Sequence, residues 1–427
     1  MAAVAATCLV SIFAAEGLLV AALLVQLARI VTGRARFLRL PVDAPILAFS
    51  VWTLLSASFS RDPVESFEDA KKLVLFLLFY LAADVMTEER PRERVLDAAL
   101  LGGFALSAGA VLQFYCLGFN TINNRPHSFL GHYMTASGLS MGILILATAR
   151  LMFGRRLALP TRQDLLALAG VVAALMALTL AQASGLFAVE AERLFVAALA
   201  GVAIAMALGR GAWPGPSTGT LLAAVAAPLS AWSLLISRTR NAWIGAVVGL
   251  AVVAILRAPR TLWFLSAALA AVLIARPEVV MDRLTLDASS VDRYYMWQAG
   301  FEMVRDRPVF GQGPGRILDA YPDYRWPEAP NALTPHMHNN ALQIAAERGL
   351  PCLAWWLWLM AALMADAWRE ARRTQAWGAV GAFALIAAIL SAGMFEYNLG
   401  DSEILLFFLI VTAIPYALHR SRALLSA

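Results

Sequence analysis

The chain has 427 residues, of which 60% are hydrophobic and 15% charged, with a formal net charge of +5 and a mean hydropathy of +0.68. No soluble core needs this much apolar sequence, and the apolar stretches are continuous where a membrane β-barrel would alternate. No basic stripe with interleaved aromatic residues occurs, so nucleic acid is not expected as a partner. The composition predicts an all-α polytopic membrane protein.

Apolar runs long enough to cross a bilayer predict about 12 transmembrane helices. In chain order they cover residues 2–31, 43–60, 72–87, 96–115, 129–152, 164–183, 190–209, 218–237, 241–257, 261–275, 340–366, 375–394 and 402–418. The first run forms either one long helix or two short ones broken around Glu16, and the side on which the N-terminus lies depends on that choice. It lacks a basic leading region and a clear cleavage site, so we expect it to be retained.

Arginine clusters recur on alternate short loops, which marks those loops as cytoplasmic. The long polar connection 276–339 then lies on the opposite side, in the periplasm of a Gram-negative bacterium. We expect one integral membrane domain, with residues 1–275 as an N-terminal bundle, 276–339 as a large periplasmic loop with short helices, and 340–427 as C-terminal helices. Within the loop, residues 291–304 predict an amphipathic helix lying along the membrane surface.

Two histidines stand directly before the span that begins near residue 340. A neutral imidazole at this boundary can accept a proton from a hydroxyl nucleophile, which makes His338 the candidate base and His336 a secondary candidate. The amides of Asn339 and Gln343 are secondary candidates beside them. The alternative is an interfacial histidine that only caps or packs. Two histidines two residues apart, without a cysteine or a zinc motif nearby, make a poor metal site, so no metal is expected.

Two arginines, Arg238 and Arg240, lie on the outer side between two spans, against the usual placement of positive charge. Their forked donors suit a phosphate or diphosphate at the membrane surface. Arg293, on the expected loop helix, can close over the same anion. The alternative is that these side chains reach lipid head groups, with Trp243 as an interfacial anchor.

Acidic residues between the last two spans complete the polar set. Glu396 and Asp401 are secondary candidates that can orient an arginine or a histidine, or bind sugar hydroxyls, unless they are only solvated loop acids. Glycines at 311, 313 and 315 predict a structural turn in preference to a phosphate loop, because no β-α-β unit surrounds them. No Asp-x-Asp pair occurs in an outer loop, so we expect a metal-independent site.

The order and spacing of these residues resemble the O-antigen ligases and their relatives, the O-antigen polymerases and bacterial protein O-oligosaccharyltransferases. That family has His-Asn, nine residues and Gly at the end of a large outer loop, matched here by His338, Asn339 and Gly349. Cys352 departs from the Gly, Thr or Tyr that the family often has three positions later. The stretch 239–243 is similar to the family's Ser-Arg-x-Ala-Trp, with Thr for Ser. The resemblance covers roughly residues 235–405.

The resemblance implies a fold similar to the C-type glycosyltransferases. It implies transfer of O-antigen polysaccharide from undecaprenyl diphosphate to a sugar hydroxyl of lipid A–core, at the periplasmic face of the inner membrane, without metal, cofactor or nucleotide sugar. His338 would be the base, and Arg238, Arg240 and Arg293 would hold the diphosphate. Displacement would be direct and inverting, among membrane lipids.

Three other functions stay open. An O-antigen polymerase would use a second lipid-linked glycan as acceptor, and a protein O-oligosaccharyltransferase would use a Ser or Thr hydroxyl. A lipid-linked glycan transporter belongs to a different class, and it predicts ionisable residues at the bilayer midplane, on broken helices in repeated halves. The polar residues here gather at the outer ends of the spans and no repeat is evident, which favours a transferase.

Overall fold

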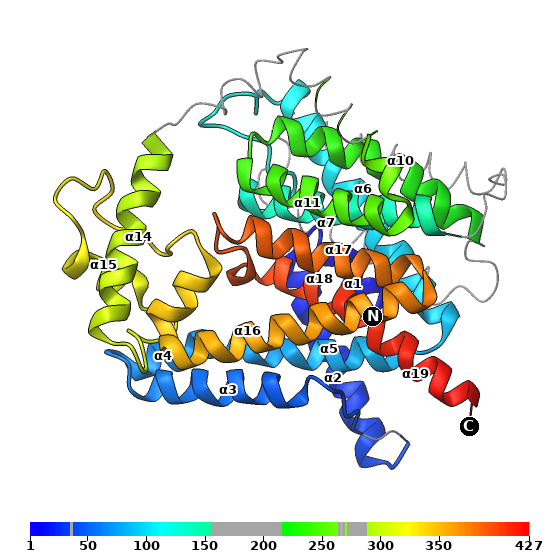
Figure 1. Cartoon of the computed structure of the whole chain (residues 1–427), viewed down its shortest axis with the longest axis horizontal. Helices are drawn as coiled ribbons and strands as arrows, with labels where there is room; N and C mark the ends of the chain where they lie inside the picture. The colour runs from blue at the N-terminus through cyan, green and yellow to red at the C-terminus, as the bar shows by residue number, and fades with distance from the viewer. Residues whose placement is uncertain (35–36, 155–215, 264–265, 267–269, 271–287, 427) are drawn as a thin grey trace.

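The computed structural model describes residues 1–34, 37–154, 216–263, 266, 270 and 288–426, and within these ranges the chain is helical without strands (Figure 1). Seven helices of this described part are long and apolar enough to cross a membrane. They are α2 (Ile12–Val31), α6 (Glu89–Cys116), α7 (Tyr133–Phe153), α10 (Pro216–Ile236), α11 (Arg240–Arg257), α16 (Asn340–Thr374) and the nearly continuous pair α18 (Ser402–Thr412) and α19 (Ile414–Ser426).

Two further apolar helices, α3 (Asp43–Ser58) and α17 (Trp377–Ala392), are shorter. The chain is therefore a multi-pass helical membrane protein. The expected spans 164–183 and 190–209, and most of 261–275, lie outside the described residues. The expected number of about 12 and the assignment of the two sides of the membrane stay predictions.

The first run is divided, but not where the sequence was expected to divide it. α1 (Ala2–Thr7) and α2 are separated at residues 8–11, and Glu16 lies inside α2. Ser11 begins the second helix because its side-chain oxygen accepts a hydrogen bond from the N–H of Ala14. α1 is buried against α6, whereas most of α2 is exposed, as a lipid-facing helix would be.

Small residues let the central helices approach closely. α10 packs on α6 and α7, and α11 packs on α7 and α17. A Cβ added at Gly103 would collide with Ile143, and one at Gly245 would collide with Met141 and the backbone of Ala388. In a membrane, where apolar surface alone does not drive helix association, such close contacts supply the packing energy. Together these helices form the main apolar core.

A second layer runs beside this bundle: α3 lies against the long helix α16. The expected span 72–87 is α5 (Phe76–Val85), preceded by the short helix α4 (Pro63–Ala70) and the 3-10 turn η1 (Lys71–Leu75). Asp62 caps α4 with its carboxylate, and Pro63 occupies the first helical position. α4 and η1 place polar side chains next to the N-terminal end of α16.

α16 is the element that shapes the site, and it is broken where one continuous span 340–366 was expected. Gly349 has φ 82° and ψ 169°, which only glycine adopts readily, and Pro351 follows two residues later. A Cβ at Gly349 would collide with the carbonyl group of Val309. Residues 340–348 thus form a separate half-helix that carries polar side chains, followed by a long apolar helix.

The described part of the long loop folds into α14 (Ala288–Asp306) and α15 (Ile317–Tyr324), at one end of the molecule (Figure 1). The expected helix 291–304 is present. Its large apolar residues Val291, Tyr294 and Phe301 are exposed, as a face that lies on a membrane surface would be, while Met296 and Met303 on the opposite face are buried. These two pack with α15, Met337 and the half-helix of α16 in a small core of their own.

Candidate functional site

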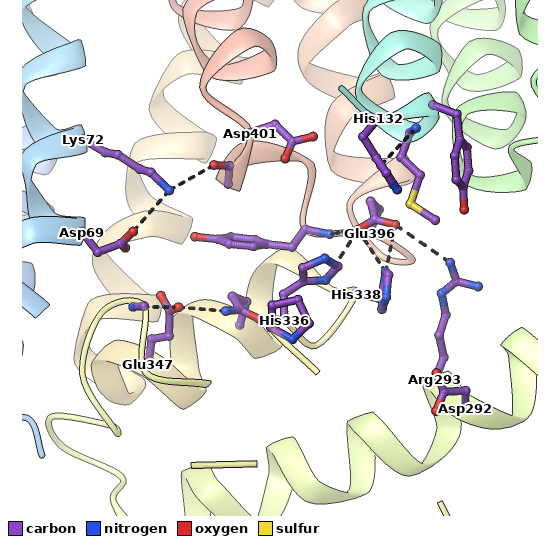
Figure 2. A pocket seen from close by; sticks show the side chains of 17 residues that line it. Asp69, Lys72, His132, Asp292, Arg293, His336, His338, Glu347, Glu396 and Asp401 are labelled. Carbon is purple, nitrogen blue, oxygen red and sulfur yellow. Dashed lines mark hydrogen bonds and ion pairs between the residues drawn. The ribbon is translucent and has the colours of Figure 1, made fainter. Parts of the chain in front are cut away.

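A cavity of about 600 Å³ opens where the loop meets the ends of α7, α16 and α18 (Figure 2). Its walls come from η1, the start of α7, α14, the half-helix of α16 and the segment before α18. The lining side chains are mostly polar or charged. They are Asp69, Lys72, His132, Tyr133, Met134, Asp292, Arg293, Gly315, Pro335, His336, His338, Gln343, Glu347, Glu396, Tyr397, Gly400 and Asp401.

The segment around Met337 places both loop histidines in the lining of this cavity. Met337 is fully buried in the small core, its N–H donates to Oε1 of Gln343 at 2.7 Å, and its carbonyl accepts from Nε1 of Trp297 at 3.0 Å. Met337 is thus fixed in the core, while His336 and His338 on either side of it line the cavity.

Two asparagines then join this segment to the connection before α18. Asn339 caps α16 by accepting from the N–H of Leu342, and its Nδ2 donates to the carbonyl of Met394 at 3.0 Å. The N–H of Asn340 donates to the carbonyl of Gly393 at 2.8 Å. These bonds hold residues 393–398 beside the histidines and bring Glu396 into the cavity.

His338 and Glu396 form a direct pair. Nδ1 of His338 lies 3.0 Å from Oε1 and 2.9 Å from Oε2 of Glu396. A carboxylate can only accept, so the proton sits on Nδ1 and the lone pair of Nε2 is left for another partner. His338 also has φ 49°, a left-handed conformation that costs free energy in a non-glycine residue. The surrounding contacts hold the backbone of His338 in a conformation that an isolated chain would avoid.

Glu396 is a buried carboxylate surrounded by basic groups. Burial by itself would raise its pKa, but the hydrogen bond from His338 and the nearby His336 and Arg293 lower the pKa below the ordinary value. Nη2 of Arg293 lies 3.9 Å from Oε2, and Nδ1 of His336 lies 3.8 Å from Oε1. Glu396 is therefore ionised at neutral pH and is the negative centre of this end of the cavity.

His336 packs beside His338, with ring centroids 4.2 Å apart. Burial and the adjacent His338 lower its pKa to about 4, so its imidazole is uncharged at neutral pH. Nδ1 of His336 is buried and makes no hydrogen bond within the described residues. The ring is thus a neutral acceptor beside the candidate base.

At the other end of the cavity, Asp401 is joined by Asp69, Lys72 and Glu347, which the sequence does not single out. Nζ of Lys72 lies 3.3 Å from Oδ1 of Asp69 and donates to the carbonyl of Gly400 at 3.4 Å. Asp401 accepts from Oγ1 of Thr135 at 2.7 Å. Glu347 accepts from Nε2 of Gln343 at 2.8 Å. Carboxylates with lone pairs to spare suit the hydroxyls of a sugar.

The glycine-rich turn at 311–315 is a structural cap, as expected. The N–H groups of Gln312 and Gly313 donate to the carbonyls of Ala346 and Glu347, at the end of the half-helix. These carbonyls would otherwise lack partners, because the helix breaks at Gly349. The N–H of Gly315 donates to the side chain of Glu347 at 3.1 Å. The turn binds the half-helix and leaves no open cradle for phosphate.

Arg238 and Arg240 are not among the residues that line the cavity. They lie in the tight connection between α10 and α11, where Nη2 of Arg238 donates to the carbonyl of Asn120 at 3.2 Å. Nη2 of Arg240 donates to Oγ of Ser290 at 3.1 Å. Ser290 precedes Arg293 by one helical turn of α14, so Arg240 is tied to the helix that carries Arg293.

The structure thus gathers six of the nine candidates in one cavity: His336, His338, Arg293, Gln343, Glu396 and Asp401. Asn339 acts instead as a helix cap, Arg240 bonds to Ser290 of α14, and Arg238 bonds to the carbonyl of Asn120. Sequence spacing missed Asp69, Lys72 and Glu347, which reach the cavity only through the packing of α4, η1 and the half-helix. It also missed His132, the N-cap of α7.

Donor atoms of His336, His338 and Glu396 all lie within 4.8 Å of one another. The sequence analysis judged the two histidines a poor metal site because no third ligand stood near them. Glu396 is 58 residues away from His338 and is brought there by folding. The described residues therefore contain a set of three groups whose chemistry suits a transition metal ion.

Comparison with known families gives one match. Residues 225–357 match the family model described as O-antigen ligase. The matched range holds Arg238, Arg240 and Arg293 as well as both loop histidines, and it ends before Glu396. No curated protein matches the chain.

Proposed function

We propose, from the match of residues 225–357 to the O-antigen ligase family and from the cavity, that the chain transfers O-antigen polysaccharide from undecaprenyl diphosphate to a sugar hydroxyl of lipid A–core. The reaction would take place at the periplasmic face of the inner membrane. The observation that carries the proposal is the His338–Glu396 pair within the polar cavity.

His338 is the base of this mechanism. Its Nε2 accepts the proton of the acceptor hydroxyl as the hydroxyl oxygen attacks the anomeric carbon of the donor sugar. Glu396 holds the ring in the tautomer with Nδ1–H and stabilises the imidazolium that forms. The bond between the anomeric carbon and the diphosphate oxygen breaks in the same step, so the configuration inverts.

The diphosphate leaving group determines which other residues the reaction needs. Diphosphate leaves readily once its charge is neutralised, and fixed positive groups at a low-dielectric boundary do this well. Arg293 lines the cavity, and Arg240 is held next to the same helix through Ser290. We assign the diphosphate to these two arginines and place Arg238 behind them as a positioning residue of the α10–α11 connection.

An apolar groove next to the polar cavity is evidence in favour of a lipid-linked substrate. It runs between α3, α5, α16 and α18 and shares Asp69, Lys72 and Tyr397 with the polar cavity. In undecaprenyl diphosphate the charged group stands directly between hydrocarbon and sugar, so a donor of this kind needs a polar site that adjoins an apolar one. The carboxylates near Lys72 then face the sugars.

The other acceptors and the transporter remain outcomes of the test. α16 is broken beside charged residues, as helices of secondary transporters are. The break is covered by the 308–315 segment of the loop, and the matched family favours transfer over transport.

The decisive experiment mixes the purified chain with undecaprenyl-diphosphate-linked O-antigen and either lipid A–core, a second donor lipid or an acceptor protein, without added metal. We expect glycosylated lipid A–core with inverted configuration at the new linkage. His338→Ala should lower the rate by about 10²–10⁴-fold, and Glu396→Gln by about 10–100-fold, because the ring stays but its orienting charge is lost.

The exposed His419 on α19 gives the matched control: His419→Ala should transfer at the wild-type rate. Thermal unfolding in detergent should show that all three variants are folded. Wild-type transfer by His338→Ala would remove the proposed base. A product formed only with the second donor lipid or only with protein would replace the ligase by one of its relatives.

A further inference from the structure

His336, His338 and Glu396 lie together at one end of the cavity, and their donor atoms have the spacing of a small coordination site. Four ligands at about 2.1 Å in a tetrahedron lie about 3.4 Å apart. Nδ1 of His338 lies 2.9 Å from Oε2 of Glu396, and Nδ1 of His336 lies 3.8 Å from Oε1 of the same carboxylate. One ligand atom from each of the three residues lies within 4.8 Å of the other two. Side-chain movements that shorten the longest of these separations would accommodate an ion.

The chemistry of the donors fits the same class of ion. Imidazole nitrogen and carboxylate oxygen are ligands of Zn²⁺, and two histidines with one glutamate leave the fourth position open. The Nδ1 atom of His336 has no hydrogen-bond partner in the described part of the chain although it is buried. A metal ion would satisfy this atom, which the proposed reaction does not use.

We propose that His336, His338 and Glu396 form an inhibitory site for Zn²⁺ or a similar transition metal ion. The proposal goes beyond glycan transfer, and its inhibitory part rests on His338 being the base.

Inhibition follows from the position of the imidazole proton. The base needs a free lone pair on Nε2, which requires the proton to stay on Nδ1. An ion bound to Nδ1 takes that lone pair, so the ring proton moves to Nε2 and the ring becomes a donor there. At the same time Glu396 turns its oxygens to the ion and no longer orients the ring. The protein then cannot accept the acceptor's proton.

Nearby charges limit how tightly the ion binds. Arg293 lies 3.9 Å from Glu396 and competes for the carboxylate. His132 lines the same end of the cavity. We therefore expect reversible binding, released by a chelator, and not a permanent structural metal. Mg²⁺ and Ca²⁺ prefer oxygen ligands and should bind poorly.

The test is a titration of the full-length, detergent-solubilised chain, stripped with chelator, with Zn²⁺ alone. Isothermal titration calorimetry should give one site, and Co²⁺ should give the visible absorption of a tetrahedral complex. His336→Ala and Glu396→Gln should each weaken binding by more than about tenfold, as loss of a group that binds or orients a metal commonly does. His419→Ala should bind as the wild type does.

A second arm follows transfer in wild type at rising Zn²⁺, with Mg²⁺ as the comparison. Transfer should fall as the calorimetric site fills and recover on chelation. Absence of Zn²⁺ binding, or binding that the His336 and Glu396 variants leave unchanged, would overturn the site. Acceleration by Zn²⁺ would overturn its inhibitory role. Because the titration needs no substrate, a failed glycan transfer would count against the proposed function alone.

Discussion

The His338–Glu396 pair depends on one buried methionine. Met337 is anchored by Gln343 and Trp297, and the histidines on either side of it line the cavity. His338 has a positive φ and pairs with Glu396. These contacts join the segment to α16, to α14 and to the connection before α18, so the site exists only in the folded chain.

Asp401 gives a test of the electrostatics at the residue scale. Burial and the like charge of Glu396 raise its pKa, against the hydrogen bond from Thr135 and the charges of His132 and Lys72. A raised carboxyl pKa means that the folded state binds the proton more tightly than the unfolded state, so this group destabilises the fold as the pH rises through its pKa. Asp401→Asn should therefore unfold at a higher temperature than wild type at neutral pH.

The amide can still accept from Thr135, so the comparison isolates the charge. The difference in unfolding temperature should shrink as the pH falls toward the ordinary carboxyl range, near 4. Thermal unfolding in detergent at several pH values measures it. A variant less stable than wild type at neutral pH would mean that the ionised Asp401 is well solvated or paired.

At the scale of the element, α16 shows which structural features the sequence predicts and which it does not. Its apolar run correctly predicts a helix from residue 340, and the histidines before it mark its outer end. The break at Gly349 was missed, although Pro351 is a local signal for it. The partner of His338 could not be read from spacing at all, since Glu396 depends on the pairing of Asn340 with Gly393.

α14 shows the same limit from another side. Its helical period is readable, but the buried face contains Ala299 and Gly300, whose small side chains score poorly as a hydrophobic stripe. An added Cβ at Gly300 would come within 3.0 Å of Leu342 in α16. This face is buried because the backbone of α14 approaches α16 closely, and not because its side chains are large and apolar. The large apolar residues lie on the opposite face.

Replacing Gly349 tests the break in α16. Gly349→Ala introduces a side chain at φ 82° and against Val309, so we expect a loss of about 1–3 kcal/mol from the backbone alone, with the collision adding to it. Transfer should fall as well, because the half-helix carries Gln343 and Glu347. Gly17→Ala in α2 is the control, since nothing lies near its added methyl group and its backbone is helical.

Thermal unfolding and transfer rate of the two variants, each compared with wild type, decide the matter. The control should be neutral or slightly more stable, because alanine favours a helix over glycine by up to about 1 kcal/mol. An unchanged unfolding temperature in Gly349→Ala would show that α16 accommodates the side chain, for example by straightening.

At the scale of the whole molecule, the site is supported by a helix bundle whose stabilising contacts lie far from the site. α6, α7, α10 and α17 meet around Arg150, whose Nη1 lies 2.5 Å from Oδ1 of Asp97 and whose guanidinium stacks 4.6 Å over the ring of Trp377. Gly219 of α10 leaves the room that this arginine fills. The two charges are almost completely buried, so each needs the other.

Removing one partner should therefore be costly. Asp97→Ala leaves Arg150, within the part of the chain that the structure describes, with Glu93 at 3.3 Å as its ionic partner, and we expect a loss of about 3–5 kcal/mol of stability. The double variant Asp97→Leu with Arg150→Met should recover most of it, because two apolar side chains need no solvation. Arg369→Ala is the control: the Arg369 side chain is 73% exposed and Asp366 keeps its hydrogen bond from Tyr416, so less than about 1 kcal/mol is lost. Thermal unfolding in detergent should show a large loss of stability in Asp97→Ala and small losses in the double variant and in Arg369→Ala. Equal losses in Asp97→Ala and the double variant would show that the cavity left behind, and not the unpaired charge, determines the loss.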